Sequence, residues 1–375
     1  MSSRASTLTL ATRGSDLALR QAATVREALA DRRHEVDLRE VETAGDRIDD
    51  ELIHRLGKTG AFVHSLDERV LAGEADAAVH SLKDVPTEDR EGLVVAAVPE
   101  RGPAGDLLVS PEGVSLSGLP AGATVGTSSL RRRAQLLAER PDLDVQPLRG
   151  NVDTRVEKLL APTLHAEHEA RVEAEEAEEQ SDTEDEGGKD GDEAPQFERT
   201  VEEWFSDLAE VERRALEREV DVEYDAIVLA EAGMDRLGLT HHVQYQRLPP
   251  EQFVPAPGQG TLAVVASEEA VVERVHETLD DPRTRVEATV ERTILEELGG
   301  GCVAPIGVRA LFQGRVVTTT ARVLSPDGEE EVADRRTLPV ERHAEAAREM
   351  AADLADRGAA ELIDRARDDA EGDST

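Results

Sequence analysis

The chain has 375 residues, enough for two or three domains, and its 81 acidic and 43 basic residues give a net charge of −38. No run of about 18 apolar residues occurs, which excludes a transmembrane helix, and the single cysteine, Cys302, excludes an intramolecular disulfide or a multi-cysteine metal site. The charge disfavours nucleic acid as a partner, because phosphate would be repelled.

The same composition sets two expectations. A chain with 39% hydrophobic residues and so many carboxylates is typical of a folded protein that stays soluble in concentrated salt, where like charges are screened. Its first residues lack the apolar stretch of a secretory signal, which favours the cytoplasm. We therefore expect a halophilic, cytoplasmic protein without metal, membrane or nucleic-acid partners.

Strand and helix patterns alternate along the first half of the chain. Helical spacing of apolar residues follows Leu17 and recurs over 62–70, and strands are predicted at 7–11, 35–41, 76–80 and 93–98. After a Gly- and Pro-containing crossing at 99–103, helices open at Ser128–Ser129 and near Val152, and strands are predicted at 106–109, 123–126, 143–148 and 224–229. This βαβ order favours mostly parallel sheets flanked by helices.

The remaining elements complete a three-part plan. A return crossing at 255–260 precedes a predicted strand at 261–266, and from residue 283 a long helix, two strands (303–311 and 315–323) and a C-terminal helix form an α+β unit. The predicted fold is α/β with two mostly parallel sheets plus this α+β domain. The predicted domains are 1–100 with 260–282, 104–256, and 283–375.

Residues 161–222 do not fit this alternation. They contain 23 acidic and six basic residues, a net charge of −17. We expect a surface insertion in the second domain whose part from Glu167 to Glu193, lacking an apolar face, is disordered or a solvated helix. A single amphipathic helix is expected to dock its end, through Trp204, Phe205, Leu208, Val211 and Leu216. A partner-binding acidic tail is the alternative.

Four loops carry arginine or small hydroxyl residues to a strand end or a helix start. They are Ala11–Ser15, Gly126–Arg133, Leu148–Arg155 and Ala232–Arg236. Helix N-termini and bidentate arginines both favour anions, so the set predicts a polyanionic ligand. Alternatively, Ser128 is only a helix cap and the arginines pair with surface acids.

Two further loops attract attention for their chemistry. One of them, His80-Ser81-Leu82-Lys83-Asp84, follows an apolar strand, and open α/β sheets place ligands at such positions. The simpler interpretations are that Lys83 and Asp84 form an ion pair in an ordinary turn and that His80 is structural. The three glycines at 299–301 precede Cys302 and predict a flexible loop that exposes its thiol; a buried, inert cysteine is the alternative.

Together these strings resemble one family, hydroxymethylbilane synthase, also called porphobilinogen deaminase. The resemblance covers nearly the whole chain except 161–222, in the family's order, and rests on ATRGS, FVHSLDE, AVHSLKDVP, VGTSSLRRR, LRGNVDTR, YDAIVLAEAG with RLGL, PGQG, and GGGCVAPIG. It implies two domains like periplasmic solute-binding proteins and a third α+β domain. It also implies a monomer that joins four porphobilinogen molecules head to tail, releasing ammonia, in tetrapyrrole synthesis.

The resemblance also implies roles for particular residues. Cys302 would carry a dipyrromethane cofactor through a thioether, and Asp84 would be the catalytic acid. The residues implied to contact the cofactor are Lys83, Ser129, Arg131, Arg132 and Arg155. Those implied to contact substrate are Arg13, Ser15, Arg149, Arg155 and Arg236. The chain departs from the family in one loop. The family commonly has lysine where Thr59 stands, and here the lysine, Lys58, comes one place earlier, so the resemblance does not carry over the cationic role of this loop in detail.

The chemistry of the substrate agrees with these residue types. Porphobilinogen carries acetate and propionate groups, so a growing chain requires several arginines. Loss of ammonia leaves an azafulvene-like cation that a carboxylate at Asp84 can stabilise while it transfers protons. A solute-binding protein would use the same arginines without Cys302 or Asp84, and an acidic scaffold would use only 161–222.

Overall fold

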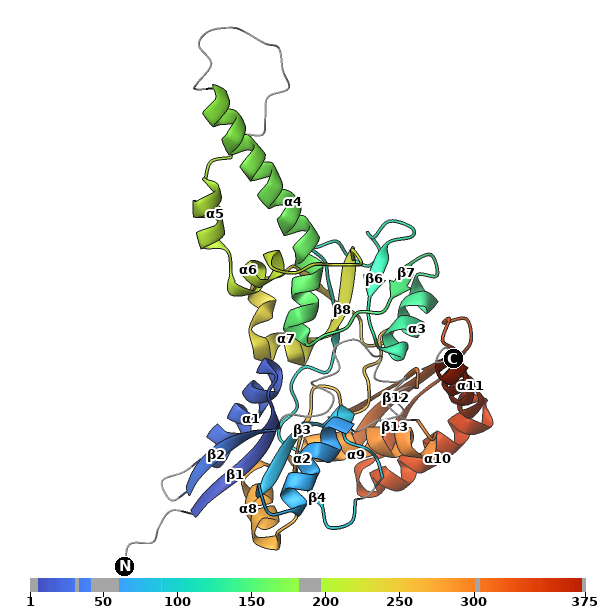
Figure 1. Ribbon diagram of the computed structural model, residues 1–375. Coiled ribbons are helices and arrows are strands. Elements are labelled where there is room, and N and C mark those ends of the chain that lie inside the picture. The colour runs from blue at the N-terminus through green and yellow to red at the C-terminus, as the bar shows by residue number, and fades with distance from the viewer. Residues whose placement is uncertain are drawn as a thin grey trace, which may run out of the picture.

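Three sheets organise the computed structural model, which describes residues 6–30, 34–41, 61–88, 90–181, 197–300 and 304–372. Two of the sheets have five strands and the third has three, and helices pack against each (Figure 1). This arrangement confirms the predicted α/β class with an additional α+β part.

The first sheet has the strand order β2-β1-β3-β10-β4. Its strands and helices are β1 (Ser6–Arg13), α1 (Asp16–Leu29), β2 (His34–Val41), α2 (Ala61–Leu71), β3 (Ala77–Ser81), β4 (Val94–Ala97), β10 (Leu262–Ala266) and α8 (Glu269–Leu279). Strand β10 runs antiparallel to both of its neighbours, β3 and β4, whereas β1 is parallel to β2 and β3. The other four strands therefore share one direction.

The second sheet repeats this plan with the order β7-β6-β8-β5-β9. Its elements are β5 (Asp106–Val109), β6 (Thr124–Gly126), α3 (Leu130–Glu139), β7 (Asp144–Gln146), β8 (Ala226–Ala230), α7 (Glu231–Leu237) and β9 (Tyr245–Arg247). Here β5 is the reversed strand. The reversed strands, β5 and β10, are the ones that directly follow the two crossings, so each crossing inserts one antiparallel strand into a mostly parallel sheet.

The third sheet is antiparallel, in the order β11-β12-β13. Its elements are α9 (Pro282–Glu297), β11 (Ile306–Gln313), β12 (Val316–Leu324), β13 (Glu331–Pro339), α10 (His343–Asp356) and α11 (Ala359–Gly372). A single core joins the helices to one face of the sheet, with Ile294, Val308, Met350 and Ile363 fully buried. The sequence predicted neither β13, a largely polar edge strand, nor the division of the C-terminal helix into two.

The acidic segment forms an arm that projects from the second sheet (Figure 1). Helix α4 (Val152–Ser181) continues through Pro162, and α5 (Val201–Asp207) and α6 (Glu210–Leu216) fold back along it. The single amphipathic helix expected around Trp204 is therefore wrong, because two capped turns, at Thr200 and Ala209, start separate helices.

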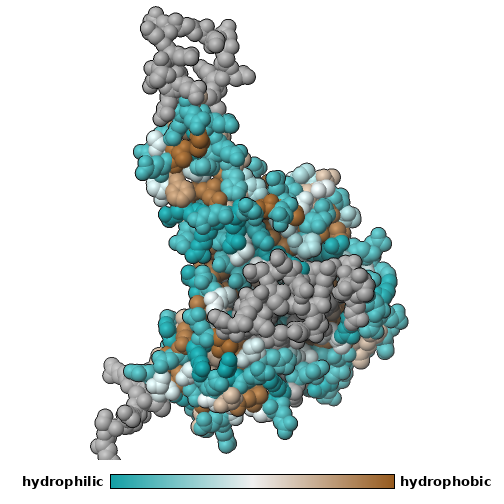
Figure 2. Space-filling model, in the orientation of Figure 1, coloured by the Kyte–Doolittle hydropathy of each residue, from teal (hydrophilic) through white to brown (hydrophobic). Residues whose placement is uncertain are grey.

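The arm also has a core of its own, and the described portion of its acidic part, up to Ser181, is helical as one of the two expected states. Leu164 and Ala174 of α4 are buried, and Leu164 shares a cluster with Trp204, Leu208 and Ala215. Figure 2 shows brown side chains on this arm among mostly teal ones. Phe205 was expected to join this cluster but is not part of it, and its side chain is 45% exposed.

The two crossings lie against each other. The amide of Gly102 donates to the carbonyl of Gly260 at 3.2 Å. Gly260 has a φ of +84°, and a Cβ there would lie 2.8 Å from the carbonyl oxygens of Gly102 and Pro103. Only glycine fits this close approach in this conformation. The Gln259 amide group adds bonds to the carbonyls of Ala104 and Gly105, at 2.7 and 3.0 Å.

Candidate active site

The segment predicted to carry the reaction forms a short 3₁₀ turn, Leu82–Asp84, at the end of β3. Leu82 is buried, and its amide donates to the carbonyl of Thr261 at 2.9 Å. Lys83 and Asp84 are exposed instead, with Nζ and Oδ1 3.6 Å apart. The turn thus anchors one apolar side chain and presents an ammonium and a carboxylate side by side.

His80 lies below this turn and does not face solvent. Its Nε2 is 3.0 Å from Oδ1 of Asp67 on α2, and both side chains are buried. The other oxygen of Asp67 accepts from Arg90 Nη1 at 3.2 Å. This chain of partners agrees with the interpretation of His80 as a structural histidine.

The predicted hydroxyl residues cap helices next to strand ends. Ser15 Oγ accepts from the amide of Ala18 at the start of α1, and Ser129 Oγ accepts from the amide of Arg132 at the start of α3, both at 3.4 Å. The cap of α3 is therefore Ser129 and not Ser128, whose hydroxyl donates to the carbonyl of Leu148. At both helix starts, free backbone amides therefore lie next to the loop that precedes the helix.

Arg131 and Arg132 are buried and share one carboxylate, Asp106 at the start of β5. Arg131 Nη2 lies 2.9 Å from Oδ2, and Arg132 Nη2 lies 2.7 Å from Oδ1. Burial by itself would raise the pKa of Asp106, but the two guanidinium charges outweigh it and lower the pKa. Arg131 also donates to the carbonyl of Val254, at 2.8 Å. Sequence reasoning did not identify Asp106 as the partner of these arginines.

Arg149, Arg155 and Arg236 differ from that pair, because no carboxylate in the described parts of the chain forms an ion pair with any of them. Arg155 Nε donates only to the carbonyl of Gly150, at 2.8 Å. Burial, together with the positive charge of Arg132, lowers the pKa of Arg155 to about 10. Burial likewise lowers the pKa of Arg236, whose Nη2 donates to the carbonyl of Gly260 at 2.8 Å.

A set of cations without acidic partners is notable in a chain of net charge −38. Nη1 of Arg149 is buried and has no hydrogen-bond partner among the described residues. An unpaired buried donor is costly, and a carboxylate ligand would satisfy it. These arginines therefore fit an anion with several carboxylates. Within the described ranges, no group of three or more His, Cys, Asp or Glu residues is placed to bind a metal.

Three predicted residues lie outside the described part of the chain: Cys302, Lys58 and Thr59. The start of the glycine run is described. Gly299 and Gly300 end α9, because their amides return to the carbonyls of Glu296 and Leu295 at 2.8 Å each. Gly299 has a φ of +64°, which is the left-handed conformation that a glycine often adopts directly after an α-helix. Two of the three glycines thus terminate the helix that precedes the cysteine.

A buried carboxylate that the sequence analysis missed joins the crossings to the third sheet. Glu291 of α9 is fully buried and pairs with Arg101 of the first crossing, at 2.7 and 3.1 Å. It accepts from the amide of Gly258 in the return crossing at 2.7 Å and from the amide of Ala310 on β11 at 2.8 Å. No local pattern marks such a residue, since its partners are remote in the chain.

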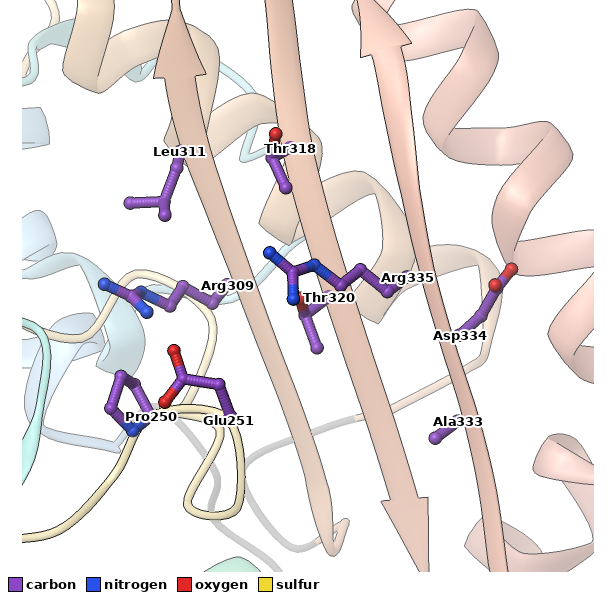
Figure 3. A pocket seen from close by; sticks show the side chains of 9 residues that line it. All are labelled: Pro250, Glu251, Arg309, Leu311, Thr318, Thr320, Ala333, Asp334 and Arg335. Atoms are coloured by element: carbon purple, nitrogen blue, oxygen red, sulfur yellow. The ribbon is translucent and has the colours of Figure 1, made fainter.

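The most evident cavity lies elsewhere. It has a volume of about 290 Å³ and opens on the face of the third sheet, where Arg309 and Arg335 flank Thr320 and a loop brings Glu251 (Figure 3). A second cavity, of about 340 Å³, is lined by Asp153, Glu157, Arg214, Glu217 and Arg218. Neither is lined by a predicted site residue, so the arginines that have no acidic partner in the described ranges locate the candidate site better than cavity size does.

No helix in the described ranges combines the length and apolar character needed to cross a bilayer.

Comparison with known proteins gives a consistent result. The family model described as "Porphobilinogen deaminase, dipyromethane cofactor binding domain" matches residues 8–175 and 209–273, and "Porphobilinogen deaminase, C-terminal domain" matches 285–358. The "Probable porphobilinogen deaminase" of Halobacterium salinarum is 55% identical over 96% of this chain and 98% of its own length. The porphobilinogen deaminases of Sulfurimonas denitrificans and Rubrobacter xylanophilus are 37% and 38% identical, covering 96% and 95% of this chain and 97% and 96% of theirs.

Proposed function

The chain belongs to the porphobilinogen deaminase family, and on this premise we propose which of its residues carry the reaction. The enzyme is a transferase of tetrapyrrole synthesis that uses a dipyrromethane cofactor. It joins four porphobilinogen molecules head to tail, releasing ammonia, and yields linear hydroxymethylbilane. The matched ranges leave out 176–208, so the outer part of the arm lies outside the family model.

The arginines without acidic partners support binding of the cofactor and the growing chain between the loops that follow the strands. When bound, dipyrromethane supplies the pyrrole to which the first substrate is joined. Arg149, Arg155 and Arg236 would pair with acetate and propionate carboxylates of the substrate chain, and Arg155 also with those of the cofactor. The helix caps at Ser15 and Ser129 would add amide donors. Arg13 is also proposed to contact substrate.

Arg131 and Arg132 have a more restricted part in this proposal. Each already forms an ion pair with Asp106, so neither is available as an uncompensated cation. A ligand carboxylate near them would be attracted by their positive charge, which also acts on Arg155, and would not displace Asp106. Their contribution to cofactor binding is therefore mainly the fixed positive potential beside Arg155.

Asp84 is the proposed catalytic acid and base. Its carboxylate is 56% exposed and lies 3.6 Å from Nζ of Lys83, so it is accessible to substrate and has a cation beside it. Its oxygens can accept a pyrrole N–H, stabilise the cation that substrate forms when ammonia leaves, and receive the proton released on condensation. Lys83 would pair with a carboxylate of the cofactor.

Three domains with the limits 1–100 plus 260–282, 104–256 and 283–375 form part of the proposal. The contacts of α8 with β4 and the place of β10 in the first sheet support the return of the chain to that unit. The cytoplasm and a monomeric state remain predictions.

Intact mass measurement tests the cofactor attachment. We expect the purified protein to carry the extra mass of one dipyrromethane, located at Cys302 by peptide mapping. Cys302→Ser should fold but lack that mass and turnover, because an alcohol is a far weaker nucleophile than a thiolate. A bare wild-type chain with full turnover, or normal turnover by the serine variant, would contradict the assignment. The solute-binding and scaffold alternatives both predict the bare chain.

Asp84→Asn tests the proposed catalyst. The change preserves size and removes the charge, so turnover should fall by about 10²-fold or more. Because the side chain is exposed and its ion pair with Lys83 is a surface pair, the melting temperature should change little. The measurements are kcat and thermal unfolding of the same preparation. Near-wild-type kcat would remove Asp84 from the mechanism.

A further inference from the structure

An arginine from outside the first sheet binds the turn that carries Lys83 and Asp84. Arg292 of α9 donates through Nη1 to the carbonyl of Val85 at 2.8 Å and through Nη2 to that of Pro86 at 2.6 Å. A longer contact, 3.4 Å, runs from Nη1 to the carbonyl of Leu82. The accepting carbonyls therefore lie on both sides of the Lys83–Asp84 pair.

These bonds suit arginine in particular. A planar guanidinium presents its donors in a fixed fork, so two or three carbonyls can be held in one relative orientation. The carbonyls of Val85 and Pro86 follow a 3₁₀ turn and take no part in the strand ladder of β3. Without Arg292, water would have to satisfy them. The contacts thus restrain the backbone of the turn and leave the Asp84 side chain exposed.

The same face of α9 also holds the apolar side of the turn. Ala288 precedes Arg292 by four residues, which places the two on one face of the helix. Ala288 is buried in a cluster with Leu82, Val98 and Ala263. One helix face therefore supplies both an apolar seat for Leu82 and a polar clamp on the carbonyls that follow it.

Helix α9 makes this restraint relevant to the reaction. It packs against β11 of the third sheet and ends at Glu297, five residues before Cys302. Helix α9 thus contacts the Asp84 turn through Arg292 and ends shortly before Cys302 in the sequence, so it connects the two segments proposed to be functional. Small errors in the relative position of Asp84 and the cofactor attachment can lower the reaction rate strongly, because a displacement of about 1 Å can reduce a rate by about 10²-fold.

We propose that Arg292 is a positioning residue, which sets the place of the Asp84 carboxylate relative to the cofactor attachment by clamping the carbonyls of Leu82, Val85 and Pro86. The inference rests on the proposed roles of Asp84 and Cys302. Arg292 acts through the backbone of the turn and needs no contact with substrate.

Arg285 offers a matched control on the same helix. Its Nη2 donates to the carbonyls of Val95 and Ala96 at 3.3 and 3.1 Å, and it pairs with Asp280. Arg285→Ala thus removes a comparable link between α9 and the first sheet without touching residues 82–86. The experiment compares Arg292→Ala, Arg292→Lys and Arg285→Ala as cofactor-loaded enzymes, measuring kcat, KM, melting temperature and amide hydrogen exchange of the peptide that spans 82–86.

We expect Arg292→Ala to lower kcat by about 10- to 100-fold with KM within about threefold, and to speed exchange in the 82–86 peptide. Arg292→Lys should recover part of kcat, since an ammonium can reach fewer of the carbonyls. Arg285→Ala should lower the melting temperature with kcat within about twofold. Comparable losses of kcat in the two alanine variants would overturn the proposal, because they would reflect weakened packing alone.

The readouts separate this proposal from the proposed function. Unchanged kcat and unchanged exchange in Arg292→Ala would overturn the clamp whatever Asp84 does. Faster exchange without a loss of kcat would overturn its role in positioning. Should Arg292→Ala fail to fold, Arg292→Lys carries the same comparison. Normal turnover by Asp84→Asn would instead refute the proposed function, while the exchange result would still report on the clamp.

Discussion

Individual arginines divide into two classes according to what they meet in the folded chain. Arg131 and Arg132 share the buried carboxylate of Asp106, whereas Arg149, Arg155 and Arg236 form ion pairs with no carboxylate in the described ranges. A partly buried cation without a counterion destabilises the protein that holds it, and binding of a carboxylate removes that cost. We therefore expect the arginines of the second class to lower the stability of the unliganded protein and to raise its affinity for a carboxylate ligand.

Replacement of Arg155 tests this trade. Its pKa is lowered to about 10, so the folded state disfavours the charged form, and this penalty is fully present below pH 10 and is relieved only as the group deprotonates. At pH 7, Arg155→Met should raise the free energy of unfolding of the cofactor-free protein by about 1–2 kcal/mol, after allowance for the lost bond to Gly150. It should also abolish cofactor assembly. Denaturant unfolding and intact mass measure the two effects.

Arg133→Met is the control for that experiment. Arg133 is an exposed neighbour on α3 whose Nη1 donates to the carbonyl of Val145 at 3.2 Å. Its replacement should give no gain in stability and no loss of cofactor. A destabilised Arg155→Met, or equal gains in the two variants, would show that Arg155 is not under electrostatic strain.

Among the elements, the arm shows how a strongly acidic stretch can be ordered. Trp204 of α5 stacks on His168 of α4, with ring centroids 5.9 Å apart. Arg171 lies over the rings of Trp204 and Phe197, at 5.3 and 4.3 Å from their centroids. One aromatic residue thus joins α5 to the outer half of α4, where most of the exposed residues are acidic and contribute no core.

Removal of this aromatic residue should loosen the arm and leave the catalytic parts in place. Trp204→Ala should cost about 3–5 kcal/mol of local stability, the range for a buried tryptophan. Limited proteolysis followed by mass measurement should show faster cleavage within 176–208, with kcat within about twofold. Phe205→Ala, one residue along and 45% exposed, should match wild type in both assays. Equal cleavage of all three proteins would mean that the Trp204 contacts do not order the arm.

The whole molecule carries a charge of −38, which makes its stability depend on salt. At 0.01 M salt the Debye length is about 30 Å, so each surface carboxylate repels many others, whereas at 1 M it is about 3 Å. Buried pairs such as Arg101 with Glu291 are screened much less than surface charges. Added salt should therefore remove repulsion while most buried links between the sheets persist.

A titration in potassium chloride tests this expectation. The melting temperature should rise steadily from 0.01 M to molar salt, and activity should rise with it, because bidentate arginine–carboxylate pairs in a partly dry site resist screening. A melting temperature that stays flat or falls would refute the halophilic interpretation. The family assignment would be unaffected, since it does not depend on surface charge.

Sequence alone determined the α/β class, most of the element order and the loops that carry the candidate site, because apolar periodicity and caps such as Ser15 and Ser129 act over a few residues. Strand β13 escaped because a polar edge strand buries too little to show that period. Only the tertiary structure decided which arginines have acidic partners, that Glu291 joins both crossings, and that Arg292 reaches the Asp84 turn. Those contacts join residues 33 to 206 positions apart, or depend on which of 81 acids lies nearest, and neither property leaves a local pattern.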